Sequence, residues 1–207
     1  MYRQQVNEVY HIFSLLNEKT FNNSLKQPII TIQSKGKLSA MGWCTLSKVW
    51  KGEEEKDNQY EINICAEYTD SPLKEIVDTI LHEMIHLDNM YKGIKDTSRN
   101  NCYHNKLFRD SAIKAGLLVT HDKKLGHAYT SLGDEMIEWL SKQEINRECF
   151  HIARESISTK AGTGKAKSKT IKYKCPSCGI LVKTTSEINI LCSDCEEEFE
   201  MVKKNEE

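Results

Sequence analysis

The first segment of the chain has apolar residues spaced for one face of a helix. They are Val6, Val9, Tyr10, Phe13 and Leu16. Steps of three and four place such residues side by side on a helix surface. The polar residues 22–24 interrupt the pattern, so an amphipathic helix is predicted to end there.

Three short apolar segments follow, and each has the pattern of a strand. Pro28–Gln33 is β-branched, Ala40–Trp50 mixes apolar and small residues, and Tyr60–Glu67 alternates polar and apolar positions. A polar turn over residues 51–59 separates the last two segments. Because strands joined by turns favour hairpins, we expect a small antiparallel sheet.

The most strongly marked helix is predicted between Ser71 and Gly93. Ser71 is a suitable cap, Pro72 suits the first turn, and Gly93 is a natural stop. The apolar positions between them repeat at helical spacing: Ile76, Val77, Ile80, Leu81, Met84 and Leu87. A second helix is predicted over residues 104–115, stopped by the glycine at position 116.

The composition changes at residue 158. Residues 158–174 are rich in Gly, Ser, Thr and Lys and contain no acid, which is typical of a flexible linker. The predicted organisation is a globular domain over residues 1–125, a helical connector over 126–157, a linker over 158–172 and a cysteine-containing module over 173–203.

The overall composition is that of an ordinary globular chain. Hydrophobic residues make up 39% of the 207 residues and charged residues 29%, which argues against global disorder. The formal net charge is −1, so any attraction to nucleic acid must come from a local patch. We recognise no secretory signal and no apolar run of membrane-spanning length. We therefore expect a cytoplasmic protein with reduced thiols and no membrane partner.

Two histidines and a glutamate interrupt the strongly apolar helix. His82 and His86 are one turn apart on the same face, so both imidazoles can reach one metal ion. Glu83 lies at the edge of that face, where it can reach a water on the metal without being a ligand. Burial of three polar groups without a shared purpose would be costly. The H-E-x-x-H spacing therefore predicts a zinc site of peptidase type, with Glu83 as general base.

A catalytic zinc ion usually has three protein ligands and one open position, so a third ligand is required. His104 is the first choice, because it follows the loop after this helix and opens the next predicted helix. Spacing alone leaves four competitors open: Asp96, Cys102, His121 and His127. The alternative interpretation is that the histidines are hydrogen-bonded core residues.

Four of the eight cysteines form two tight pairs: Cys175 with Cys178, and Cys192 with Cys195. Two C-x-x-C pairs at this separation suit one tetrahedral zinc ion. Such a four-thiolate site is closed and structural, and it predicts a zinc ribbon that has little core of its own. The alternatives are a redox couple or two unrelated pairs.

Lysines are concentrated just before the first cysteine pair: Lys165, Lys167, Lys169, Lys172 and Lys174. Lysines can neutralise phosphates without reading a base sequence. Tyr173 lies among them and is predicted to stack on an unpaired base. The alternative is a lysine-rich linker that binds nothing.

Five stretches of the sequence are similar to a known family. They are Asn17–Leu25, Ala40–Cys44, Ile62–Ile64, Ile80–His86 and His104–Phe108. Together they cover most of residues 5–120, and they resemble the SprT-like zinc metallopeptidases. The eukaryotic relative Spartan, in that family, degrades proteins crosslinked to DNA.

The resemblance implies a fold, a third ligand and a partner. The implied fold is an α+β zincin-like core, with helices packed on a small antiparallel sheet, followed by the four-cysteine zinc ribbon. His104 and Phe108 match the family's third-ligand histidine and the phenylalanine after it. Related proteins pair the peptidase with a DNA-binding zinc module, which favours DNA as a partner, including single-stranded DNA. The long partner-binding tail of Spartan has no counterpart, which favours a bacterial or phage-type relative.

The motifs predict a zinc-dependent endopeptidase, and the resemblance implies that it acts on DNA-associated or DNA-crosslinked proteins. Two zinc ions per chain are expected, one catalytic and one structural. One alternative is a nucleic-acid-binding accessory protein whose zinc sites are all structural. Another is an amidase that uses the same metal chemistry on a different bond.

Overall fold

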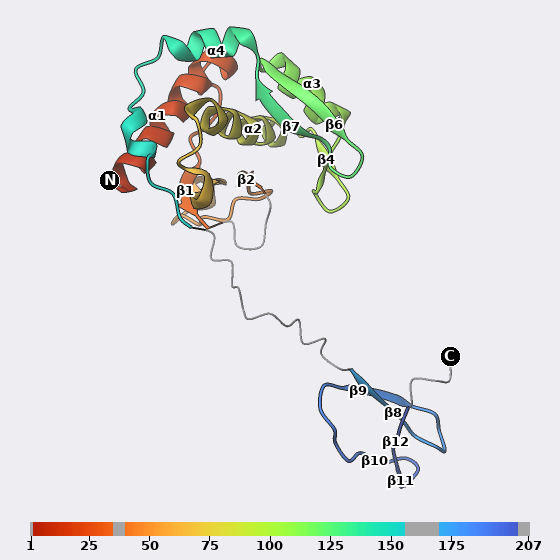
Figure 1. Ribbon diagram of the computed structural model, residues 1–207. Coiled ribbons are helices and arrows are strands. Elements are labelled where there is room, and N and C mark those ends of the chain that lie inside the picture. The colour runs from red at the N-terminus through yellow and green to blue at the C-terminus, as the bar shows by residue number, and fades with distance from the viewer. Residues whose placement is uncertain (1, 35–39, 156–169, 203–207) are drawn as a thin grey trace. The chain divides into compact units, whose positions relative to one another are not determined.

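The computed structural model describes residues 2–34, 40–155 and 170–202 (Figure 1). Contacts divide the chain between Ser156 and Ile157 into two compact units. The fold is of the α+β class, with helices and small sheets in the first unit and short strands in the second. No helix within the described ranges has the length and apolar character needed to cross a bilayer.

Four α-helices are found among the described residues of the first unit: α1 (Tyr2–Phe21), α2 (Leu73–Tyr91), α3 (Lys106–Lys114) and α4 (Asp134–Ser141). The described residues of this unit also contain short 3-10 helices: η1 (Glu55–Asp57), η2 (Ala66–Tyr68) and η3 (Arg147–Phe150). The two helices predicted first along the chain are thus confirmed. Gly93 has a φ of +67° and its N–H bonds to the Met90 carbonyl, so a left-handed residue ends α2 as expected.

The first sheet packs against α1 and α2 and contains β1 (Ile29–Gln33), β3 (Glu61–Cys65) and β2 (Gly42–Cys44), in that order. β2 is antiparallel to β3, but β1 is parallel to β3. The prediction of a purely antiparallel sheet is therefore wrong. β3 lies between β1 and β2 in the sheet. The consecutive strands β1 and β2 therefore do not form the hairpin that was expected.

The second sheet has the order β4 (Thr97–Ser98), β5 (Tyr103–His104), β7 (Gly126–Leu132) and β6 (Leu117–Asp122). β7 is antiparallel to β6 and pairs in parallel with β5 at one position, His104 with Gly126. The second sheet contacts α2 and α3, which brings β5 and β7 close to the helix with the two histidines.

The predicted helical connector, residues 126–157, is not what the described part of that range, residues 126–155, forms. These residues begin with strand β7, and the segment after α4 and η3 is bonded to η2 and the residue that follows it. The Arg154 N–H donates to the Ala66 carbonyl at 2.8 Å, and the Thr69 hydroxyl donates to the Ile152 carbonyl at 2.6 Å. Because Met136, Leu140 and Phe150 are buried in the same core as α1 and α2, this segment is part of the first unit.

The start of α3 also differs from the prediction. Asn105 caps the helix, because its side-chain oxygen accepts the N–H groups of Leu107 and Phe108 at 2.7 and 3.3 Å. The helix begins at Lys106, and His104 consequently lies in strand β5 instead of the first helical turn.

The core of the first unit lies between α1, α2 and the first sheet. In the parallel pair, Ile30 faces Ile62 and Ile32 faces Ile64, which gives one apolar surface. The helices bury their apolar faces against it. The most deeply buried contributors are Ile12, Phe13 and Leu16 of α1 and Ile76, Ile80, Leu81 and Met84 of α2.

The second unit has two small sheets. One has the order β12 (Glu200–Met201), β8 (Ile171–Lys174) and β9 (Leu181–Thr184). The other pairs β10 (Leu191–Cys192) with β11 (Glu197–Glu198). Most of the predicted linker lies in residues 158–169, outside the described residues, and β8 already occupies the end of that predicted range.

Phe13→Ala tests whether the α1 core holds the first unit together. Phe13 is 1% exposed, so its truncation is expected to lower the free energy of unfolding by about 3–5 kcal/mol. The exposed neighbour Ser14→Ala is the control, with an expected change within about 0.5 kcal/mol. Urea unfolding followed by tryptophan fluorescence reports on the first unit alone, because it contains Trp43, Trp50 and Trp139. Equal midpoints for both variants would contradict this placement of α1.

Candidate metal centre

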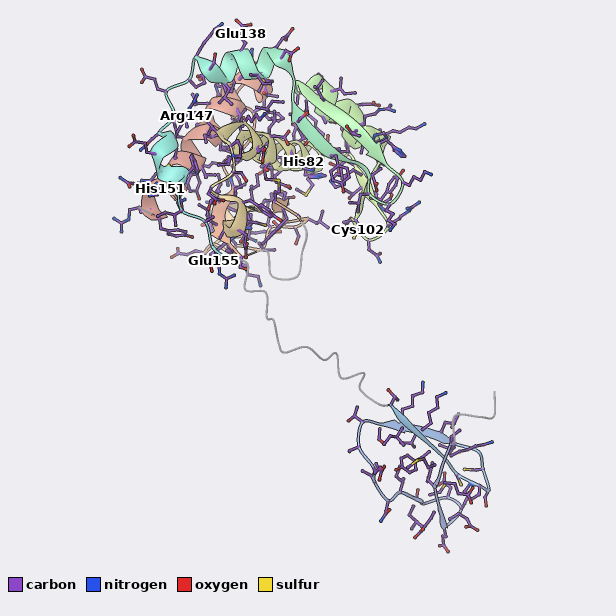
Figure 2. All side chains as sticks on the ribbon, in the orientation of Figure 1. His82, Cys102, Glu138, Arg147, His151 and Glu155 are labelled. Carbon is purple, nitrogen blue, oxygen red and sulfur yellow. The ribbon has the colours of Figure 1, made fainter. Side chains whose placement is uncertain are left out.

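Three histidine side chains converge on one point of the first unit. α2 carries His82 and His86, and β5 carries His104. Nε2 of His104 lies 3.2 Å from Nε2 of His82 and 3.0 Å from Nε2 of His86. The three potential ligand atoms lie within 4.8 Å of one another. Figure 2 marks His82 where α2 meets the second sheet.

The β4–β5 hairpin delivers His104 to this point. The Asn105 N–H donates to the Asp96 carbonyl at 3.0 Å, and the His104 N–H donates to the Leu125 carbonyl at 2.9 Å. Gly126 is required beside His104. It has a φ of +70°, and a Cβ there would lie 2.1 Å from the His104 carbonyl oxygen. The close approach of β7 thus fixes the backbone of the third histidine.

His86 is oriented by a buried carboxylate. Its Nδ1 donates to Oδ2 of Asp96 at 2.7 Å, and Asn89 donates to the same oxygen at 2.9 Å. Ser111 of α3 in turn donates to the Asn89 side-chain oxygen at 2.9 Å. Burial alone would raise the pKa of Asp96, but the hydrogen bonds from His86 and Asn89 hold it below its ordinary value. With its proton on Nδ1, His86 turns an unprotonated Nε2 toward His104.

His82 is contacted from the other side by Thr130 of β7. Nδ1 of His82 lies 3.2 Å from the Thr130 hydroxyl, which donates to Oδ2 of Asp78 at 3.1 Å. Burial raises the pKa of Asp78 to about 6, so it is mostly ionised at neutral pH. Its other oxygen, Oδ1, is buried and has no hydrogen-bond partner among the described residues.

Phe108 forms an apolar wall behind the three imidazoles. Its ring centroid lies 4.6 Å from those of His82 and His86 and 4.7 Å from that of His104. The ring is stacked on His86 at 29° and meets His104 edge-on at 79°. Because Phe108 is fully buried, it fixes the imidazoles in place on that side.

The donor set fits a zinc ion. Nitrogen ligands about 2.0–2.1 Å from a tetrahedral zinc are about 3.3 Å apart, close to the distances found here. Burial lowers the pKa of His82 well below its ordinary value and that of His104 to about 4. These two imidazoles are therefore neutral at neutral pH, which is the state that binds metal. A shared cation would lie between nitrogens that the fold already holds together.

Glu83 lies beside the histidines on α2 and is 6% exposed. Burial raises its pKa to about 7, against the opposing effects of His86 and a hydrogen bond from the Cys44 N–H of β2. β2 can approach the helix closely because of Gly42, where a Cβ would lie 2.9 Å from the Thr79 side chain. Glu83 is thus a buried carboxyl group able to exchange a proton near neutral pH.

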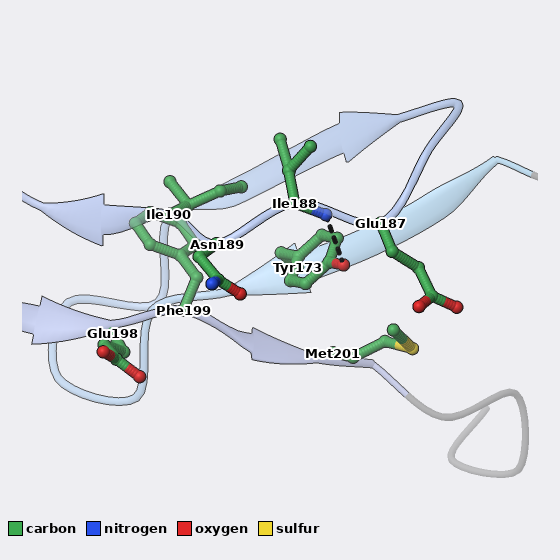
Figure 3. Close-up of a pocket in the computed structure, with 8 residues that line it drawn as sticks. All are labelled: Tyr173, Glu187, Ile188, Asn189, Ile190, Glu198, Phe199 and Met201. Atoms are coloured by element: carbon green, nitrogen blue, oxygen red, sulfur yellow. Dashed lines mark hydrogen bonds between the residues drawn. The ribbon is translucent and has the colours of Figure 1, made fainter.

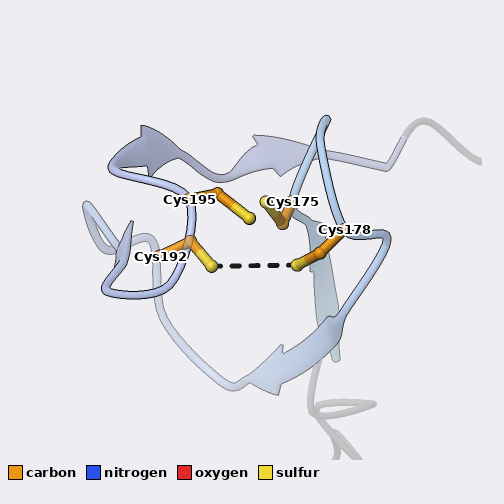
Figure 4. Close-up of side chains that lie close together, drawn as sticks. All are labelled: Cys175, Cys178, Cys192 and Cys195. Atoms are coloured by element: carbon orange, nitrogen blue, oxygen red, sulfur yellow. Dashed lines mark hydrogen bonds between the residues drawn. The ribbon is translucent and has the colours of Figure 1, made fainter.

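The second unit brings its four cysteines together, as Figure 4 shows. The sulfurs of Cys175, Cys178, Cys192 and Cys195 lie within 4.8 Å of one another, and all four are free thiols. Sγ of Cys178 is 3.8 Å from Sγ of Cys192, far beyond a disulfide bond. Sulfur ligands about 2.3 Å from a tetrahedral zinc would be about 3.8 Å apart, so this group also fits zinc.

Each cysteine pair sits on a turn closed by a left-handed residue. The Gly179 N–H donates to the Cys175 carbonyl at 3.0 Å, and the Glu196 N–H donates to the Cys192 carbonyl at 2.8 Å. Gly179 has a φ of +76° and Glu196 a φ of +56°. The two turns are equivalent, but only the first has the glycine that favours this conformation.

The competitors for the third-ligand position lie elsewhere. Asp96 supports His86 from behind, and Cys102 is exposed in the β4–β5 hairpin. His121 and His127 form a separate pair with ring centroids 4.9 Å apart, and neither joins the three converging histidines. The structure thus groups His104, and none of these four, with His82 and His86.

The described residues include only some of those predicted to contact nucleic acid. Lys165, Lys167 and Lys169 lie outside the described residues, whereas Lys172 and Lys174 are exposed on β8. Tyr173 is 5% exposed, and its hydroxyl accepts the Ile188 N–H at 3.2 Å (Figure 3). The proposed stacking of Tyr173 on a base is therefore wrong, because its ring is in the interior of the unit.

Several residues around the centre were not found from the sequence. Asp78 lies one turn before His82, a spacing that could have drawn attention to it. Thr130 and Gly126 gave no local signal, since they reach the centre only through the pairing of β7 with β5 and β6.

Gly179→Ala and Glu196→Gly should have opposite effects on the second unit. A Cβ at position 179 meets nothing closer than 3.6 Å, so the cost arises from the left-handed backbone alone, about 1–2 kcal/mol. Glu196→Gly relieves the same strain in the second turn. In a chelator competition for zinc held by the cysteines, Gly179→Ala is expected to lose metal more readily and the double variant to recover. A double variant weaker than Gly179→Ala would contradict the equivalence of the turns.

Comparison with known proteins identifies the first unit. Residues 9–123 match the SprT-like family, which confirms the resemblance carried by the motifs. No curated protein and no solved structure matches the chain. The match covers more than half of the 207 residues and includes His82, Glu83, His86 and His104. The chain therefore belongs to the SprT-like family, and its first unit contains a metallopeptidase-like domain.

Proposed function

We propose that the protein is a zinc-dependent endopeptidase with a zincin-like core. The observation that carries this proposal is the convergence of three histidine nitrogens, 3.0 and 3.2 Å apart, beside the buried Glu83. His82, His86 and His104 would hold the catalytic zinc, and the four cysteines a structural one. When bound, a catalytic zinc polarises the scissile carbonyl and lowers the pKa of water to about 7.

Glu83 is assigned the proton transfers. A general base works best when its pKa is close to the working pH, and burial raises the pKa of Glu83 to about 7. The carboxylate takes the proton of the attacking water and then delivers it to the nitrogen of the departing amine. The Cys44 N–H holds the carboxylate from the β2 side while it does so.

The first sheet supports an extended peptide as substrate. β2 is the outer strand of this sheet within the described residues. The Met41 carbonyl and the Thr45 N–H bond inward to β3, so the backbone groups of Gly42 and Cys44 face outward. Cys44 donates to Glu83 from this outer edge, which places the edge beside the general base. An extended chain that pairs with such an edge would pass its peptide bonds across the metal centre.

We further propose that the substrates are proteins associated with DNA. On β8 and β9, Lys172 lies directly opposite Lys183, and both lysines are exposed. Lys174 is two residues further along β8, opposite Glu200. Exposed lysines can neutralise the phosphates of a nucleic acid without reading its sequence. We therefore assign this lysine face of the second unit to DNA, so that the peptidase acts on proteins bound there.

Glu83→Gln tests the mechanism. Glutamine keeps the shape of the side chain but cannot accept the proton, so cleavage of casein is expected to fall at least about 100-fold. The zinc content, measured by elemental analysis, should remain that of the wild type. Glu75→Gln, at an exposed position of the same helix, is the matched control and should cleave normally. Full activity of Glu83→Gln would eliminate the proposed mechanism.

The double variant Lys172→Ala/Lys183→Ala tests the DNA assignment. Loss of two phosphate contacts should weaken binding to a single-stranded oligonucleotide. The negative slope of log K against log salt should become less steep by about 1.4. Lys123→Ala/Lys142→Ala removes the same charge from exposed positions of the first unit and should leave the slope unchanged. Identical slopes for the two double variants would show that DNA is not bound by this face.

A further inference from the structure

Strand β7 contacts two of the three histidines, although it lies after the segment that matches the family. The match ends at residue 123, and β7 begins at Gly126. Gly126 pairs with His104, and Thr130 contacts His82. These two residues lie on one strand, on either side of the register shift in its pairing with β6. This part of the chain therefore supports the metal centre from outside the matched region.

The direction of the hydrogen bonds follows from the donors available. Thr130 has one hydroxyl proton, and an ionised carboxylate can only accept, so Thr130 donates to Asp78 at 3.1 Å. The Thr130 oxygen must then accept from Nδ1 of His82 at 3.2 Å. A proton on Nδ1 leaves Nε2 unprotonated, and Nε2 is the atom that faces His104.

A bridging hydroxyl links two side chains of α2. Asp78 is one turn before His82 on the same helix, and Oδ2 of Asp78 and Nδ1 of His82 both contact the Thr130 hydroxyl. Asp96, which comes from outside α2, contacts His86 directly at 2.7 Å. Thr130 spans the corresponding gap for His82.

The two oxygens of the Asp78 carboxylate differ in their hydrogen bonding. Its Oδ1 is buried without a hydrogen bond among the described residues, which costs stability. Its Oδ2 bonds to Thr130. A buried carboxylate whose hydrogen bond leads to a metal-ligating imidazole is the arrangement that orients ligands in metal sites.

We propose that Thr130, anchored by Asp78, is a positioning residue that fixes the tautomer and ring orientation of His82 for metal binding. The inference rests on the proposed function only in taking His82 as a metal ligand. Thr130 touches neither the peptide nor the attacking water in this assignment, and it acts through His82.

Thr130→Val and Thr130→Ser separate the hydrogen bond from packing. Valine keeps the volume and removes the hydroxyl, whereas serine keeps the hydroxyl and removes a methyl group. In the full chain, the first equivalent of zinc fills the four thiolates, and the second is titrated against a chelator. Thr130→Val is expected to bind the second equivalent about 10–100-fold more weakly, and Thr130→Ser as tightly as the wild type. Ser131→Ala, exposed on the same strand, is the matched control and should match the wild type.

Long-range ¹H–¹⁵N NMR spectra report directly which nitrogen of His82 carries the proton. The wild type and Thr130→Ser should hold it on Nδ1, and Thr130→Val should show a mixture of tautomers before zinc is added. The proposal is overturned if Thr130→Val binds zinc more tightly than Thr130→Ser does. It is also overturned if the His82 tautomer is the same in all variants. If Thr130→Val does not fold by tryptophan fluorescence, Thr130→Ala replaces it with the same expected loss.

These readouts are independent of proteolysis. If the wild type does not cleave protein but Thr130→Ser binds zinc more tightly than Thr130→Val, the proposed peptidase activity is overturned and the role of Thr130 stands. If the wild type cleaves protein but all variants bind zinc with equal affinity, the role of Thr130 is overturned and the peptidase activity stands.

Discussion

The first unit depends on one arrangement, three imidazole nitrogens that converge beside the buried Phe108. Nitrogens 3.0 and 3.2 Å apart must share a proton or a cation. The hydrogen bonds of Asp96 and Thr130 turn Nε2 of His86 and Nε2 of His82 toward His104, so the protein itself brings together the nitrogens that a metal would bind. Metal binding and folding are therefore expected to be coupled in this unit.

The centre is assembled from segments far apart in the chain. α2 supplies two histidines and the glutamate, the β4–β5 hairpin supplies the third histidine, and β7 supports both groups. Phe108 of α3 closes the back of the pocket. Because each element is packed into the same core or sheet, the geometry is set by the fold as a whole and not by a single loop.

Local patterns were sufficient to predict the features that depend on local spacing. The helical period predicted α2 with His82 and His86 on one face, and the cysteine spacing predicted the grouping of the four thiols. Spacing alone leaves His104 as one of several candidates for the third ligand. The family resemblance distinguishes it from the others. The parallel pairing of β1 and the contacts of β7 were missed, since they join residues distant in sequence.

The burial of the Tyr173 ring can be predicted from the sequence itself. In residues 171–174, apolar and lysine residues alternate, so a strand there puts Tyr173 on the face opposite Lys172 and Lys174. The ring is buried while the lysines are exposed. Aromatic and basic residues that are neighbours in sequence cannot share one face of a strand, and only the lysines remain as candidates for phosphate contacts.

The extent of β7 has a consequence for what counts as the minimal folded domain. The family signature ends at residue 123, yet the strand that completes the second sheet follows it, and residues 150–154 are held against η2 and the core. A fragment cut at the end of the signature would leave β5 and β6 without their shared neighbour. The smallest autonomous piece of this protein is therefore longer than the segment by which its family is recognised, and an expression boundary belongs near residue 155.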